Sequence, residues 1–249
     1  MQALAAIGRF GGFCGELAVR AVRGPWYLRS VGRHTWGVIA ACVLPVTAVV
    51  FPFGMVMAVQ GLDIFNMFGA HRMLASLISV TVLRELSPVL ASVLVAAQAG
   101  SAFAAELASM RMKEELDATE VMCVDQLAYH AVPRILALLI ACPLLNVIGS
   151  IAGISGGFIV AVFVKGEQAG VFLSELWAFT QPVDIWSGML KTLVFGLVIG
   201  LVATYQGMTA TGGAAGVGRA VNDTVVWSVV VFITANYFLT SLFFGTVQG

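Results

Sequence analysis

Long stretches without formal charge constrain this chain more than any other feature of its sequence. A helix that crosses a membrane needs roughly 20 consecutive apolar residues, each adding about 1.5 Å to its length. Such stretches begin near Thr35, Met73, Ile135, Thr192 and Thr224, and the second is interrupted only by an adjacent arginine and glutamate. We therefore predict five membrane-spanning helices, at residues 35–62, 73–106, 134–164, 188–207 and 224–246.

Composition places the chain in the membrane class. Hydrophobic residues make up 59% of it, charged residues make up 10%, and the mean hydropathy is +0.96. Soluble domains are about a quarter charged. The 13 basic and 13 acidic residues balance, so net charge gives no sign of nucleic acid as a partner. The four cysteines are far apart and lack metal-ligand spacing. We expect an all-α membrane protein with one domain over residues 1–249.

Basic residues predict the orientation, because they accumulate on the cytoplasmic side of membrane helices. With five spans, one side carries Arg9, Arg20, Arg23, Arg29, Arg33, Arg111, Lys113, Arg134 and Arg219. The other side keeps Arg72, Lys165 and Lys191. The N-terminus is therefore predicted to lie in the cytoplasm and the C-terminus on the outer side of the membrane.

The N-terminal segment, residues 1–33, is amphipathic and does not span the membrane. On a helical wheel one stripe is apolar, formed by Phe10, Phe13, Cys14, Leu17 and Ala21. Charged residues lie beside this stripe, and Gly24-Pro25 ends the pattern. The pattern predicts an interfacial helix in the cytoplasmic headgroup layer. A soluble arm that packs on a partner is the alternative.

Small residues recur at helical spacing in the predicted third span. Gly149, Gly153 and Gly157 follow one another at intervals of four residues, which places them on one face of the helix. Such spacing lets a neighbouring helix approach closely. It indicates a tightly packed bundle or dimer and no particular chemistry.

Arg84 and Glu85 interrupt the second apolar stretch. About 20 residues separate them from Glu106, which places them near the outer end of the span. Ionisable residues at such depth usually face a cavity or a partner, and Pro88 removes a backbone donor one turn later. We therefore predict that Arg84, Glu85 and Pro88 border a lipid-facing cavity where the guanidinium meets a headgroup anion. The alternative is an interfacial anchor that extends toward the headgroups.

An acidic helical segment, residues 111–123, separates the second and third spans. Met112, Leu116, Thr119 and Cys123 share one stripe at helical spacing. The residues predicted to couple the membrane part to a soluble partner are Glu114, Glu115, Leu116, Asp117 and Glu120. A short helix with one apolar stripe and one acidic face can dock into a groove on a soluble domain. A solvated acidic loop is the alternative.

Sequence motifs for nucleotide hydrolysis are missing. Residues 212–218 are rich in glycine but lack the lysine and the preceding strand of a phosphate-binding loop. Carboxylate–histidine metal motifs are missing too. We predict that the chain is not an enzyme, and that any ATP-driven motor lies on another chain.

Several motifs in succession carry a family resemblance. In order these are RELSPVL at 84–90, GSAFAAEL at 100–107, MRMKEELDA at 110–118, EVM at 120–122, VPR at 132–134 and GGAAGVGRAV at 212–221. Together they resemble the core and C-terminal signatures of the MlaE/YrbE permeases, over nearly the whole chain.

The resemblance implies the membrane subunit of an ABC-type lipid transporter in the bacterial cytoplasmic membrane. It implies an exporter-like permease fold with an interfacial elbow helix and five spans. The implied partners are a second permease copy or paralogue, two cytoplasmic ATPases that bind ATP and Mg, and MCE-domain proteins on the outer side. Under this resemblance residues 111–123 form the coupling helix, and Arg84 and Glu85 lie near the lipid cavity.

Two other classes of function fit the same spans. A stand-alone secondary transporter or channel usually carries ionisable residues at the midplane, broken helices in paired positions or an inverted repeat. Of these features, the sequence shows only two ionisable residues within an apolar stretch, Arg84 and Glu85. A structural scaffold for an envelope complex is the other possibility.

Overall fold

The structure is a computed structural model of the chain, and it describes residues 2–23, 27–68 and 73–245. Regular structure in these residues is entirely helical. Five helices are long and apolar enough to cross a membrane, at Leu28–Phe65, Leu74–Met112, Leu127–Val164, Pro182–Met208 and Gly213–Phe244. The predicted all-α membrane class with five long apolar helices is confirmed. The predicted turn at Gly24-Pro25, the outer-side Arg72 and residue 246 lie outside the described residues.

The helices extend beyond the uncharged stretches from which we predicted them. In chain order the α-helices are α1 (Gln2–Arg23), α2 (Leu28–Phe68), α3 (Leu74–Thr81), α4 (Ser87–Val95), α5 (Ser101–Met112), α6 (Glu115–Val121), α7 (Val132–Ile159), α8 (Ala169–Phe179), α9 (Pro182–Met208) and α10 (Gly213–Phe244). α9 begins at Pro182, before the predicted start at residue 188, so it includes the charged Asp184. α10 likewise begins at Gly213, before the predicted start at residue 224, and includes the charged Arg219 and Asp223.

Four π-helical turns lie within the second and third spans: η2 (Val82–Leu86), η3 (Ala96–Gly100), η4 (Leu127–Ala131) and η5 (Val160–Val164). Two of these turns end two residues before a proline, η2 before Pro88 and η4 before Pro133. A proline has no N–H to donate, and its ring collides with the carbonyl four residues earlier in an α-helix. A wider turn is one way to relieve that collision, and π-turns recur at functional positions.

The chain divides into two compact units, and each long helix contributes a segment to both. The first unit contains the residues up to Ile39, Val95–Ala141 and Val194–Ala235. The second contains Ala40–Leu94, Cys142–Leu193 and the residues from Asn236 onward.

In the first unit, the apolar stripe of α1 packs on the protein itself. Leu17 is buried in a cluster with Ala131, Val132 and Ile135, which Phe13 joins from the same stripe. The rings of Phe10 and Phe13 also meet Tyr205 edge to face, at centroid distances of 5.2 and 5.4 Å. The predicted amphipathic helix thus has its apolar stripe directed at α7 and α9, and its relation to the headgroup layer stays a prediction.

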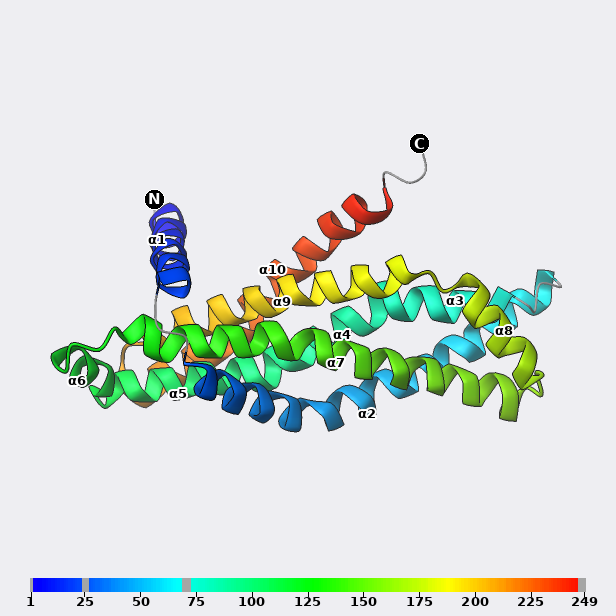
Figure 1. The fold of residues 1–249 in the computed structure, drawn as a ribbon, viewed down its shortest axis with the longest axis horizontal. Helices are drawn as coiled ribbons and strands as arrows, with labels where there is room; N and C mark the ends of the chain where they lie inside the picture. The colour runs from blue at the N-terminus through cyan, green and yellow to red at the C-terminus, as the bar shows by residue number, and fades with distance from the viewer. Residues whose placement is uncertain (1, 24–26, 69–72, 246–249) are drawn as a thin grey trace. The chain divides into compact units, whose positions relative to one another are not determined.

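In the second unit, α3 and α8 lie side by side (Figure 1). Phe172 and Leu176 of α8 pack against Leu74 and Ile78 of α3 in one buried cluster. The sequence had not predicted α8, which falls between the third and fourth spans.

Glycines let α2 and α7 touch through their backbones in the second unit. A Cβ added to Gly54 would lie 1.9 Å from the carbonyl oxygen of Gly153. A Cβ added to Gly156 would lie 2.2 Å from the carbonyl oxygen of Phe51. The predicted close approach at the third span is confirmed at Gly153.

Candidate functional site

A turn between α8 and α9 places the first acidic residue of the site. Pro182 is the first residue of α9, a position where its missing N–H costs nothing. Two residues later, Asp184 Oδ2 accepts a hydrogen bond from the backbone N–H of Gln181 at 3.0 Å. This bond satisfies one of the free donors at the helix start, where a carboxylate is also favoured by the helix dipole.

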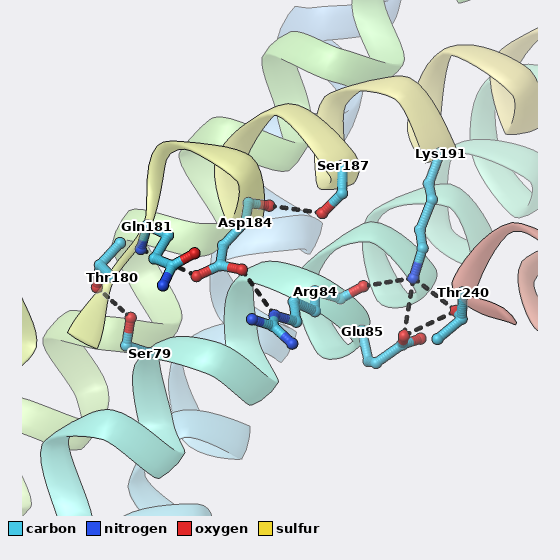
Figure 2. Close-up of polar contacts among 9 residues, drawn as sticks. All are labelled: Ser79, Arg84, Glu85, Thr180, Gln181, Asp184, Ser187, Lys191 and Thr240. Carbon is cyan, nitrogen blue, oxygen red and sulfur yellow. Dashed lines mark hydrogen bonds and ion pairs between the residues drawn. The ribbon is translucent and has the colours of Figure 1, made fainter. Parts of the chain in front are cut away.

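The same carboxylate binds Arg84. The Nε of Arg84 donates to Asp184 Oδ1 at 2.7 Å, as Figure 2 shows. The Asp184 side chain is completely buried, whereas Arg84 keeps 30% of its side-chain surface exposed. The guanidinium also lies over the ring of Phe244, 4.0 Å from its centroid. A buried carboxylate needs such a partner, because an unpaired charge in an apolar interior is very unfavourable.

Lys191 forms the second half of the site. Its side chain is fully buried, and its ammonium donates to Glu85 Oε1 at 2.7 Å and to Thr240 Oγ1 at 2.7 Å. The third bond goes to the backbone carbonyl of Arg84 at 2.8 Å. That carbonyl lies four residues before Pro88, which has no N–H to offer it. All three donors of the ammonium are therefore used.

Glu85 is held from a third helix as well. Its carboxylate accepts hydrogen bonds from Asn236 Nδ2 and Thr240 Oγ1 of α10, each at 2.9 Å. The π-turn η2, α9 and the end of α10 are thus connected by one network. We call Arg84, Glu85, Asp184 and Lys191 the charge cluster, and its two acids and two bases balance.

Helix geometry explains why adjacent residues reach different partners. Arg84 and Glu85 point in different directions because neighbouring positions on a helix diverge by about 100°. Asp184 and Lys191 are seven residues apart on α9, so they lie on one face two turns apart. Figure 2 shows each of the first pair directed at one member of the second.

Sequence reasoning identified half of this cluster. Arg84 and Glu85 were visible because they interrupt an apolar stretch, whereas Lys191 entered only as a basic residue of the outer side. Asp184 was not considered. Opposite charges seven residues apart at the start of an apolar helix were the signal that could have found both.

The three lipid-cavity candidates occupy different environments. Arg84 lines an open groove of about 400 Å³ whose other walls include Phe65, Leu77 and Phe179. Glu85 is directed at Lys191 and the end of α10, and Pro88 is buried in the helix. The structure therefore brings Arg84 alone to this groove, and the roles of all three stay predictions.

The acidic segment forms a short helix with exposed carboxylates. α6 begins after Glu114, which has a left-handed backbone with φ 60°. Leu116 is buried, and Asp117 accepts from Arg111 at 2.5 Å. Glu120 accepts from Gln126 Nε2 at 3.1 Å. Every predicted coupling residue except Leu116 is exposed: Glu114, Glu115, Asp117 and Glu120.

The apolar stripe predicted for this segment is shorter than expected. Cys123 lies beyond the last residue of α6, is exposed, and has φ 58°. The neighbouring Val121 and Met122 are exposed too. The exposed surface of α6 and of the residue that follows it therefore contains both acidic and apolar side chains.

A family model described as Permease MlaE matches residues 31–242 of the chain. A "Probable ABC transporter permease protein" of Rickettsia felis is 35% identical over 240 residues, which cover 96% of this chain and 92% of that protein. The "Intermembrane phospholipid transport system permease protein MlaE" of Haemophilus influenzae is 34% identical and covers 77% of this chain and 74% of its own length. The chloroplastic protein TRIGALACTOSYLDIACYLGLYCEROL 1 of Arabidopsis thaliana is 32% identical over 92% of this chain and 66% of that protein.

Proposed function

The chain belongs to the MlaE permease family, and on that premise we propose that it is the membrane-spanning permease subunit of an ABC-type lipid transporter. The phospholipid-transport name of a relative that is 34% identical supports the lipid as cargo. The bacterial inner membrane is the corresponding location. This subunit moves lipid without catalysing a reaction, and ATP and Mg bind to a separate ATPase.

The position of Arg84 is the observation that carries this proposal. Within the described residues, the guanidinium uses only its Nε in a hydrogen bond, and that bond fixes its orientation. The remaining four N–H groups are available to an anion. Because the guanidinium lines a groove with apolar walls, a lipid phosphate or carboxylate can bind there while its chains contact those walls.

Exposed surfaces support two of the proposed partners. The acidic side of α6 offers carboxylates and exposed Val121 and Met122 to a cytoplasmic ATPase. α10 is mostly exposed and apolar, with Trp227, Tyr237 and Phe238 on its surface, which suits packing against a second permease copy. MCE-domain proteins on the outer side complete the proposed assembly.

The test uses the assembled transporter in liposomes and measures transfer of a fluorescent phospholipid. Arg84→Ala should abolish most transfer while leaving assembly with the ATPase intact, and Arg84→Lys should restore only part, because an ammonium cannot form a bidentate contact. Lys165→Ala is the matched control, since Lys165 is a basic residue that pairs with Asp63 and does not line the groove.

In Arg84→Ala/Asp184→Asn the unpaired carboxylate is removed, so stability should recover but transfer should not. Recovery of transfer would make Arg84 an anchor for Asp184 only.

A stand-alone secondary transporter is the second candidate, and the buried pair Lys191–Glu85 favours it, since ionisable residues within membrane helices often carry coupling ions. The complete satisfaction of the Lys191 ammonium argues for a structural connection instead. Purified permease without an ATPase decides between them: lipid transfer driven by an imposed ion gradient would favour the secondary transporter.

A further inference from the structure

A second cavity, separate from the groove at Arg84, lies within the second unit. Its volume is about 220 Å³, and η2, α7, α8 and α9 enclose it. Most of its wall is apolar and includes Val147, Ile151, Ile154, Trp177, Ile185 and Met189. Ile151 and Trp177 are largely exposed, so the cavity opens at the surface of this unit.

One buried polar group in the wall has no partner. Asn146 is only 3% exposed, and its Oδ1 accepts no hydrogen bond within the described part of the chain. The residue is held in place through its backbone carbonyl, which accepts from Ser87 Oγ at 2.8 Å. An unsatisfied buried acceptor is unfavourable, so native proteins nearly always supply it with a donor.

We propose that this cavity binds a single alkyl chain that carries a neutral hydroxyl, with the hydroxyl donating to Asn146 Oδ1. The walls belong largely to segments that are long and apolar enough to span the membrane, so the bilayer is the source of the ligand. An acceptor requires a donor, and a neutral one, since a charged group would be left unpaired in an apolar cavity. The volume lies below the roughly 300–1,000 Å³ of ordinary ligand pockets, which selects one chain over two.

An ordered water is a weaker explanation for the same acceptor. A buried water needs two to four polar partners. Besides Asn146, the polar residues of the wall are Ser150 and Thr180. Thr180 is already engaged with Ser79 and with the carbonyl of Leu176, so Ser150 is the one further wall side chain that could hold a water at Asn146 Oδ1. The site also does not depend on lipid transport, because the bilayer offers such chains to any membrane protein. Its failure would leave the proposed transport function standing.

Photolabelling of the detergent-purified full chain tests this site. The probes are a diazirine-bearing hexadecanol and its methyl ether, which has the same chain and no donor. Mass spectrometry of digested protein should find the alcohol attached to the α7 and α9 peptides about five-fold more than the ether, the factor expected for one hydrogen bond. Equal labelling by the two probes would overturn the proposal and leave water as the partner of Asn146.

Two variants assign the labelling to the cavity. Asn146→Leu, which keeps a similar volume without the acceptor, should abolish the difference between alcohol and ether. Ile151→Trp fills the opening and should reduce labelling by both. Leu144→Trp is the matched control, because Leu144 is exposed on the same side of α7 but does not line the cavity. If Asn146→Leu does not fold, the two tryptophan variants decide, and equal labelling of both would refute the site.

Discussion

Glu85 and Asp117 are both partly exposed carboxylates that pair with a basic side chain, but the basic side chains lie in opposite environments. Glu85 binds the completely buried ammonium of Lys191 and takes further hydrogen bonds from α10. Asp117 meets Arg111 on the surface, where the two side chains are 52% and 40% exposed. Desolvation explains the difference: a buried ion needs every polar group satisfied by protein, whereas water satisfies an exposed one.

The two environments suit different tasks. In the charge cluster, each bond joins segments that are distant in sequence, so the pairs specify how η2, α9 and α10 meet in the second unit. On α6, the ion pair is local and can be exchanged for contacts with another protein at little cost. Buried pairs therefore organise the permease, and exposed carboxylates remain available to a partner.

The largest expected effect comes from breaking the buried pair on one side. Lys191→Met removes the ammonium, leaves the Glu85 carboxylate without its cation and frees the Arg84 carbonyl. Loss of one partner of a buried pair costs roughly 3–5 kcal/mol. We expect about 3 kcal/mol here, because Glu85 is 38% exposed and water can reach part of it. Thermal unfolding of the detergent-solubilised protein measures the change.

Two further variants sharpen this result. Lys191→Met/Glu85→Gln removes both charges and should recover part of the lost stability. Lys113→Met is the surface control, because Lys113 lies 3.9 Å from Glu115 and is 67% exposed, and its stability should be unchanged. Equal losses in Lys191→Met and Lys113→Met would refute the distinction between the two environments.

A matched pair of acid-to-amide changes tests the same contrast on the carboxylate side. Asp184→Asn keeps the shape and can still accept from Gln181, but it leaves Arg84 without a charged partner. We expect a loss of about 2 kcal/mol, in the range for hydrogen bonds to charged groups. Asp117→Asn should cost between about 0 and 1 kcal/mol, because exposed ion pairs contribute little. Denaturant titration of both variants compares them directly, and a larger loss for Asp117→Asn would contradict the expectation.

The sequence predicted the exposed region more completely than the buried one. The acidic helix could be predicted because its acidic and apolar residues recur at helical spacing within one short segment. The five spans could be predicted from the long uncharged stretches. The partners of Glu85 were not visible, since Asn236 and Thr240 lie 151 and 155 residues away. The short helix α8 was missed because its apolar residues pack against α3, a contact that no local pattern encodes.

Charge reversal on α6 should change binding without changing the fold. Glu114→Lys/Asp117→Lys converts two exposed acidic positions, and we expect co-purification with the cytoplasmic ATPase to weaken about tenfold, or ~1.4 kcal/mol. Stability should change by no more than about 1 kcal/mol, because the lost Arg111–Asp117 pair is exposed. Wild-type recovery of the ATPase with the double variant would show that this segment is only a solvated loop.

The smallest effect concerns the backbone at the end of α6. Cys123 is exposed and has φ 58°, a left-handed conformation that is strained for a side chain with a Cβ. Cys123→Gly removes that strain, and part of the gain is offset because glycine has more freedom to lose on folding. We expect a net stabilisation of about 0.5 kcal/mol.

The neighbouring Met122 has φ −79°, so Met122→Gly should be destabilising and serves as the control. Unfolding of both variants in one detergent measures the difference, and a loss of stability in Cys123→Gly would mean that the thiol makes contacts that outweigh the backbone strain. If the gain is found, the exposed side of α6 is shaped by backbone conformation, in contrast to the charge cluster, where paired side chains fix the geometry.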